Sequence, residues 1–170
     1  MDAMNLAILI LRVGIGGTLV MHGYGKVFQG GGISGTAGWF DSMGMKPGKV
    51  HAWMAALIEI GAGVLVVLGL FTSLAAAAMV GVMVVAAWTV HRHNGFMIMR
   101  EGWEYTFVLA VVAIGIAMLG PMKWSLDSII GIDDAWDGYI GLAIAGGGGV
   151  LAGIGQLVLF YRPPESLNPS

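Results

Sequence analysis

The 170 residues of this chain are strongly apolar, with 57% hydrophobic and only 11% charged residues. A soluble domain carries roughly twice that share of charge, so the composition excludes an ordinary soluble domain and indicates one integral membrane domain. The net charge of −2 argues against a nucleic-acid partner, and the absence of Cys excludes thiolate metal ligands, thiol nucleophiles and a dithiol relay within the chain.

Five apolar segments approach the roughly 20 helical residues that are needed to cross a bilayer. In chain order they cover residues 5–27, 51–70, 74–90, 104–119 and 139–161. A Gly-rich stretch at 29–49 follows the first segment, and a short interfacial helix is predicted within it at 38–45. Gly120 and Pro121 end the fourth segment, and a loop rich in Asp leads into the fifth, which contains a run of four glycines.

This pattern predicts an all-α fold. We expect a polytopic membrane protein with five transmembrane helices, of which the C-terminal one is Gly-rich. The acidic loop and the fifth helix occupy 128–161, and a disordered tail is predicted at 162–170. Because small residues let helices approach closely in lipid, the Gly-rich helix also offers a surface for oligomerisation.

Basic residues are unequally divided between the two sides that alternate loops would occupy. One side holds Lys26, Lys46, Lys49, Arg92, Arg100 and Arg162. The other side holds only Lys123. Because basic loops stay in the cytoplasm, we predict a multi-pass membrane protein with its N-terminus outside and its C-terminus cytoplasmic.

Charged residues within the apolar segments need partners, since one charge at mid-membrane costs about 2.5–3.5 kcal/mol on insertion scales. Arg12, His22 and Lys26 fall on one face of the first helix, and Glu59 lies near the middle of the second. At about 1.5 Å per residue, Arg12 and Glu59 reach similar depths, so we predict that they form an ion pair. This pair would either contribute to a ligand site or only hold the first two helices together.

Further polar residues gather at the basic-side ends of their helices and indicate a pocket that opens from one membrane face. Together with the buried pair, the candidate pocket residues are Arg12, His22, Lys26, Glu59, His91 and Glu104. Apolar walls with a few convergent polar groups suit a neutral organic ligand with a polar head. The alternative for these side chains is an anchoring belt at the interface, which is the favoured interpretation for the nearby Trp and Tyr residues. His51 and His93 are predicted to be interfacial, and no catalytic residue is identified.

Two other kinds of site are less favoured. His22 and His91 end different helices on the same side, so they are the candidate ligands of a haem b, but histidine at a helix end is usually a polar anchor. A metal site is not expected, because Cys is absent and the carboxylates are widely spaced.

A series of short motifs occurs in a specific order and spacing. They are Arg12 in the first helix, His22-Gly23-Tyr24-Gly25-Lys26-Val27-Phe28, Phe40-Asp41-Ser42-Met43-Gly44-Met45-Lys46-Pro47, Glu59 with Gly61, Leu68-Gly69-Leu70-Phe71-Thr72, His91-Arg92-His93-Asn94-Gly95-Phe96, Gly102-Trp103-Glu104-Tyr105, and Leu119-Gly120-Pro121-Met122-Lys123-Trp124-Ser125-Leu126-Asp127. In these motifs the chain resembles the DoxX family of bacterial integral membrane proteins (DoxX/DoxD-like) from about Leu6 to Asp127. The family's Gly-Pro-Gly-Arg-Tyr-Ser-Leu-Asp is Gly-Pro-Met-Lys-Trp-Ser-Leu-Asp here, and the fifth span lies outside the family's four-helix core.

The resemblance implies a compact four-helix transmembrane bundle core at 1–127, to which the fifth helix is added, and a location in the bacterial inner membrane. It also implies a link to oxidoreductase assemblies, among them thiosulfate:quinone oxidoreductase, which has a DoxD subunit, and complexes that handle thiol and oxidative stress. We therefore favour an accessory membrane subunit of a redox complex that binds a quinone beside His22, Lys26, Glu59 and Glu104. Its partners would be the bilayer and other membrane or soluble oxidoreductase subunits. The alternatives are a scaffold or assembly subunit without a ligand, and a small-solute carrier, for which five short spans leave little room.

Overall fold

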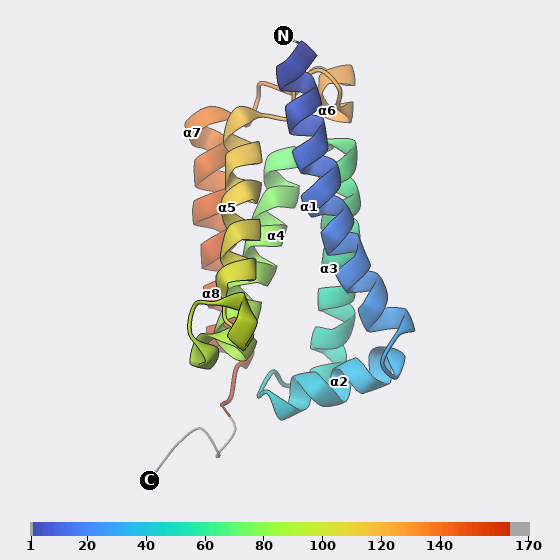
Figure 1. Ribbon diagram of the computed structural model, residues 1–170, viewed down its shortest axis with the longest axis vertical. Helices are drawn as coiled ribbons and strands as arrows, with labels where there is room; N and C mark the ends of the chain where they lie inside the picture. Colours follow the sequence, from blue (N-terminus) through green and yellow to red (C-terminus); the bar gives the residue numbers. More distant parts are fainter. Residues whose placement is uncertain (1, 164–170) are drawn as a thin grey trace.

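Five apolar helical spans run along the long axis of the molecule (Figure 1). The computed structural model describes residues 2–163. Four of its helices are long and apolar enough to cross a membrane: Ala3–Phe28, Gly48–Leu68, Thr72–Asn94 and Gly138–Phe160. The remaining span, Glu104–Leu119, has 16 residues and a length of about 24 Å, somewhat short for a hydrocarbon core of about 30 Å. The predicted all-α fold of a multi-pass membrane protein is confirmed.

The helices are named in chain order, and two of the spans contain π-helical turns. They are α1 (Asp2–Phe28), α2 (Gly32–Ser42), α3 (Gly48–Leu68), α4 (Thr72–Ala86) continued by η1 (Ala87–His91) and η2 (Arg92–Asn94), η3 (Ile98–Arg100), α5 (Glu104–Leu119), α6 (Leu126–Ile129), and the fifth span composed of α7 (Gly138–Gly141), η4 (Leu142–Gly148) and α8 (Gly149–Phe160). The interfacial helix predicted at 38–45 is α2, which begins six residues earlier. Gly31, with φ 87°, precedes it, and Gly44, with φ 96°, lies just beyond its end.

Helices α1 and α3 pack in backbone contact through glycines. A Cβ atom on Gly16 would lie 2.7 Å from the carbonyl oxygen of Gly63, and a Cβ on Gly23 would lie 2.9 Å from that of Ala56. The two helices are antiparallel, and the residue numbers in each of these pairs sum to 79. This register places Arg12 level with Val67 of α3.

Helix α4 lies at the centre of the bundle, and the fifth span packs against it. Leu19, Val66, Met79, Ile116 and Ala145 form part of one buried apolar cluster that joins all five spans. A Cβ on Gly149 or Gly153 of α8 would lie within 3 Å of α4 atoms, so these glycines already serve contacts within the chain. A Cβ on Gly147 or Gly155 would have no neighbour within 4 Å. Oligomerisation through the side of the fifth span that carries these two glycines stays a prediction.

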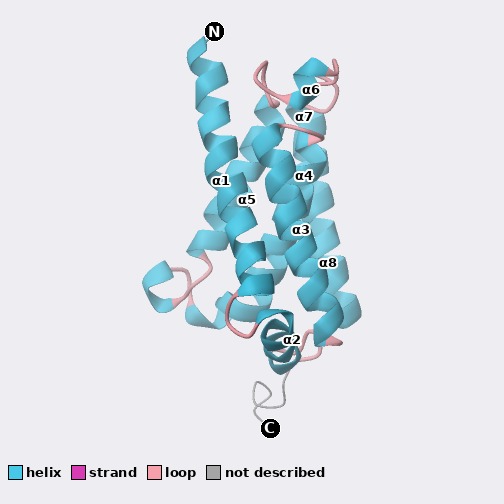
Figure 2. Cartoon of the chain, turned by 90° about the vertical axis from the view of Figure 1, so that its right-hand side faces the viewer, coloured by secondary structure: helices cyan, strands magenta, loops and turns pink. Residues whose placement is uncertain are grey.

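Helix α2 lies across one end of the bundle, roughly perpendicular to the long helices (Figures 1 and 2). The turn after α2 is tied to the end of α8, because Arg162 N donates to Gly44 O at 2.8 Å and Met45 and Tyr161 form an isolated antiparallel bridge. The predicted disordered tail at 162–170 lies outside the described residues from 164 onward.

Candidate ligand cavity at the basic end of the bundle

An ion pair between a partly exposed lysine and a buried glutamate joins α1 and α3 near the end of the bundle that α2 covers. Lys26 Nζ lies 2.7 Å from Glu59 Oε2, and Glu59 is only 4% exposed. The backbone of Lys26 lies nearer the basic end than the backbone of Glu59, but side chains on a helix lean toward the N-terminus of that helix. In these antiparallel helices, the lysine stem therefore leans inward and the glutamate leans outward, so the two charged groups meet.

The predicted Arg12–Glu59 pair is wrong. The contacts of Gly16 with Gly63 and of Gly23 with Ala56 set a register in which Arg12 lies level with Val67. Glu59 is eight residues away from that level, or about 12 Å. Counting depth from the expected helix ends could not reveal this offset, because the close glycine contacts determine how the two helices slide past each other.

Arg12 instead holds backbone groups together at the opposite end of the bundle. Its guanidinium donates to the carbonyl oxygens of Val66, Val67, Pro121 and Trp124 at 2.8–3.0 Å, and the side chain is 1% exposed. Two of these carbonyls belong to the last turn of α3, where carbonyls run out of intrahelical partners, although Val66 O also accepts from Gly69 N at 3.1 Å. These contacts support a structural role for Arg12, away from the ion pair.

Asp127 performs the complementary task at the start of α4. Its carboxylate accepts from Phe71 N at 2.7 Å, from Thr72 N at 3.0 Å and from Thr72 Oγ1 at 2.8 Å. An acidic group is favourable at a helix N-terminus, because the first N–H groups are unpaired and carry partial positive charge. The α3–α4 turn is therefore held by Arg12 on its carbonyl side and by Asp127 on its amide side.

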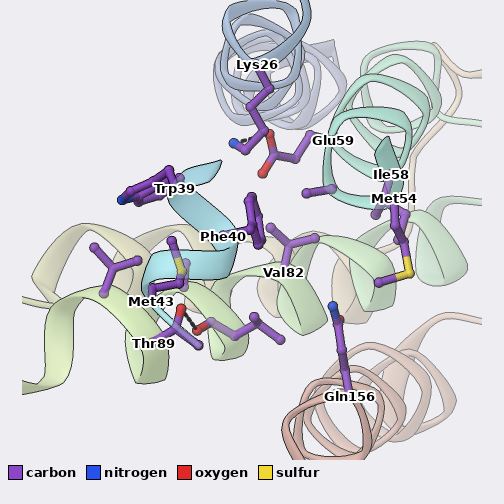
Figure 3. Close-up of a pocket in the computed structure, with 14 residues that line it drawn as sticks. Lys26, Trp39, Phe40, Met43, Met54, Ile58, Glu59, Val82, Thr89 and Gln156 are labelled. Carbon is purple, nitrogen blue, oxygen red and sulfur yellow. Dashed lines mark hydrogen bonds and ion pairs between the residues drawn. The ribbon is translucent and has the colours of Figure 1, made fainter. Parts of the chain in front are cut away.

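A small cavity lies beside the Lys26–Glu59 pair, between α1, α2, α3, α4 with η1, and α8 (Figure 3). Its volume is about 80 Å³. The lining is mainly apolar and consists of Lys26, Trp39, Phe40, Met43, Met54, Ala55, Ile58, Glu59, Val82, Val85, Ala86, Thr89, Val90 and Gln156. In Figure 3 the ion pair lies on one side of this space, and Gln156 points into it from α8 on another.

The volume of the cavity limits what it can hold. An engineered apolar cavity that takes up benzene has about 150 Å³, so a ring enters this cavity only if its walls move. Met43 and Met54 are the residues best suited to such movement, because Met is unbranched and adapts its shape at low cost.

The predicted pocket residues do not form a single cluster. Lys26 and Glu59 line the cavity, whereas His22 lies beside Lys26 in an open hollow on the outside, with its Nε2 atom 3.2 Å from Tyr105 Oη. His91 and Glu104 hold the loop before α5: His91 Nδ1 lies 2.6 Å from Glu101 O, and Glu104 Oε2 accepts from Ile98 N at 2.8 Å.

Both histidines considered as haem ligands therefore have partners within the protein, and these contacts offer the haem alternative no support. Among residues 2–163, no group of three or more His, Asp or Glu side chains is arranged to hold a metal ion.

Sequence reasoning missed two polar residues near the cavity, Gln156 and His51. His51, predicted to be interfacial, is 1% exposed, and its Nδ1 atom lies 3.3 Å from Gln156 Nε2. Gln156 could have been recognised from the sequence, because it is a single amide side chain within a strongly apolar span. The sequence does not indicate that His51 is buried, because its burial depends on the packing of the end of α8 against the start of α3.

The fold and the cavity define a multi-pass membrane protein whose helices contact the lipid bilayer. The chain belongs to the DoxX family, whose model matches residues 7–92. It is also similar to the protein of Bacillus subtilis (strain 168) named "Putative oxidoreductase CatD", with 31% identity over 126 residues that cover 74% of this chain and 88% of the relative. No solved structure shows a significant match. The predicted family membership is confirmed.

Proposed function

We propose that the protein is an accessory membrane subunit of a redox complex, and that its cavity binds the ring of a quinone. The observation that carries the proposal is the Lys26–Glu59 pair, an ion pair in an apolar cavity at the basic end of the bundle. Ionisable groups within membrane spans are costly and commonly belong to functional sites. The printed name of the Bacillus subtilis relative supports an oxidoreductase connection.

The lining of the cavity fits the chemistry of a quinone ring. Lys26 Nζ carries three N–H donors, and Glu59 engages one of them, so the others are available to a ring oxygen. Phe40, Ile58 and Val82 supply apolar surface for the ring itself. A bound quinone would supply the capacity to take up and release two electrons, which the side chains of a chain without Cys lack. Electrons would come from a partner subunit.

A paired substitution tests the proposal. Lys26→Met together with Glu59→Gln removes both charges without leaving one of them buried and unpaired, so folding should be preserved. We expect the wild-type protein, purified in mild detergent, to carry quinone that solvent extraction and mass spectrometry detect. We also expect it to bind a decyl-substituted 1,4-benzoquinone, with about tenfold weaker binding in the double variant.

The matched control is Glu104→Gln, which neutralises a carboxylate that holds a loop outside the cavity and should leave quinone content unchanged. If wild-type protein neither carries quinone nor binds the benzoquinone probe, the redox proposal is wrong. The scaffold alternative, which the structural role of Arg12 favours, predicts that result together with defective assembly of the double variant. A carrier would instead reveal itself as solute flux in proteoliposomes.

A further inference from the structure

The fifth span contributes a polar side chain to a cavity that is otherwise built from the first three spans and the region of α2. Gln156 of α8 lines the cavity and points into it, on a different wall from Lys26 and Glu59 (Figure 3). Residue 156 lies beyond the segment that the family model matches, which ends at 92. The side chain that α8 adds to the cavity therefore lies outside the matched part of the chain.

Gln156 is oriented by a buried histidine. Its Nε2 atom donates to His51 Nδ1 at 3.3 Å, and the His51 ring packs edge-on against Phe160 with 4.9 Å between ring centroids. An amide nitrogen carries two N–H groups, so the bond to His51 leaves a second donor and the amide oxygen. Because His51 is 1% exposed and held by its packing, it limits the orientations available to the amide.

The pair also leaves hydrogen-bonding capacity unused. His51 Nε2 is buried and has no hydrogen-bond partner among the described residues. Burying a polar group without a partner costs free energy, and an apolar pair at positions 51 and 156 would avoid that cost. A buried imidazole and an amide in this location are therefore poorly explained by stability alone.

We propose that Gln156, positioned by His51, donates a hydrogen bond to the far edge of a ring whose near edge contacts Lys26. The site would then select flat ligands that carry acceptor atoms at two opposite edges over ligands that carry a polar atom at one edge only. This inference rests on the proposed function, because it assigns a selectivity residue to the same cavity.

The test compares two probes with the same tail, a decyl-substituted 1,4-benzoquinone with two opposite oxygens and 4-decylphenol with one. We expect Gln156→Leu to weaken binding of the benzoquinone about fivefold and to leave phenol binding within about twofold, since one neutral hydrogen bond is lost. Gln156→Asn keeps the amide but shortens its reach, so it should behave like Gln156→Leu. Val158→Leu, on the exposed outer side of α8, is the control and should change neither affinity.

Two outcomes separate this inference from the proposed function. If the wild type binds the benzoquinone and Gln156→Leu weakens both probes equally or neither, Gln156 does not determine selectivity, and only this inference is overturned. If the wild type binds neither probe, the proposed function fails and takes the inference with it.

His51 is tested as a positioning residue through the ratio of the two affinities. His51→Phe keeps an aromatic ring against Phe160 but loses the partner of Gln156, and should lower the benzoquinone-to-phenol preference as Gln156→Leu does. His51→Asn offers a polar atom near the position of Nδ1 and should restore most of the preference. A merely structural role would lower both affinities and leave their ratio unchanged, which would contradict the assignment.

Discussion

The charged residues that bind across the bundle have two distinct environments. Arg12 and Asp127 bind backbone groups at one end of the bundle, where they supply hydrogen-bond partners to the end of α3 and the start of α4. Lys26 and Glu59 bind each other at the other end and face a cavity. Only the second pair has hydrogen-bonding capacity directed at a space that a ligand can occupy.

Arg12 should therefore matter for stability and not for ligand selectivity. Arg12→Met removes four hydrogen bonds from a charged donor and should lower the free energy of unfolding by about 3 kcal/mol or more. Arg100→Met, at an exposed position, should change it by no more than about 0.5 kcal/mol. Thermal unfolding in detergent measures both, and equal melting temperatures for the two variants would contradict the structural role.

The charged residues themselves were evident from the sequence, but their partners were not. Arg12, Lys26 and Glu59 stand out because charge is rare in apolar segments. Which of them pair depends on the sliding of α1 along α3, and that sliding follows from backbone contacts that composition does not reveal. The same limit applies to His51, whose burial requires the end of α8 to lie over α3.

At the scale of helices, the expected spans agree with the structure to within a few residues at most ends. Long apolar runs and turn residues such as Gly120 and Pro121 were sufficient for that agreement. The π-helical turns η1 and η4 were not foreseen, because their apolar sequences fit an α-helix equally well. Residues 86–90, which include most of η1, contribute Ala86, Thr89 and Val90 to the cavity wall.

The contact between α1 and α3 provides a sharp test at this scale. Gly16 touches the backbone of α3, whereas a Cβ on the adjacent Gly17 would have no neighbour within 4 Å. We expect Gly16→Leu to separate the two helices, lower the yield of folded protein and weaken the Lys26–Glu59 pair. Gly17→Leu should be tolerated. Similar loss of folded protein in both variants, measured by size-exclusion chromatography in detergent, would contradict the glycine contact as the determinant of register.

At the scale of the whole molecule, the two ends of the bundle differ in charge. Helix α2 and the loop before α5 lie at one end, with Lys46 and Lys49 following α2 and Arg100 in the loop, whereas α6 lies at the other end (Figure 1). Lys123 is the basic residue of the loop that precedes α6. This asymmetry supports the proposal that the cavity end faces the cytoplasm.

Reporter fusions test that orientation. Green fluorescent protein joined after residue 170 should fluoresce, and alkaline phosphatase joined at the same place should be inactive, because the C-terminal end is expected in the cytoplasm. A phosphatase inserted after Lys123 should be active. The reverse pattern would place the cavity end outside the cell and would contradict the charge argument.

The wall that α8 adds to the cavity has a consequence for biosynthesis. Lys26 and Gln156 stand 130 positions apart, and at about 5–20 residues per second a ribosome needs roughly 7–26 s to make the intervening chain. During that interval the first spans can insert and bring Lys26 to Glu59, but the wall formed by α8 does not yet exist. A nascent chain that stops before residue 156 lacks the wall that carries Gln156, and we expect the cavity to close only when the last helix has been made.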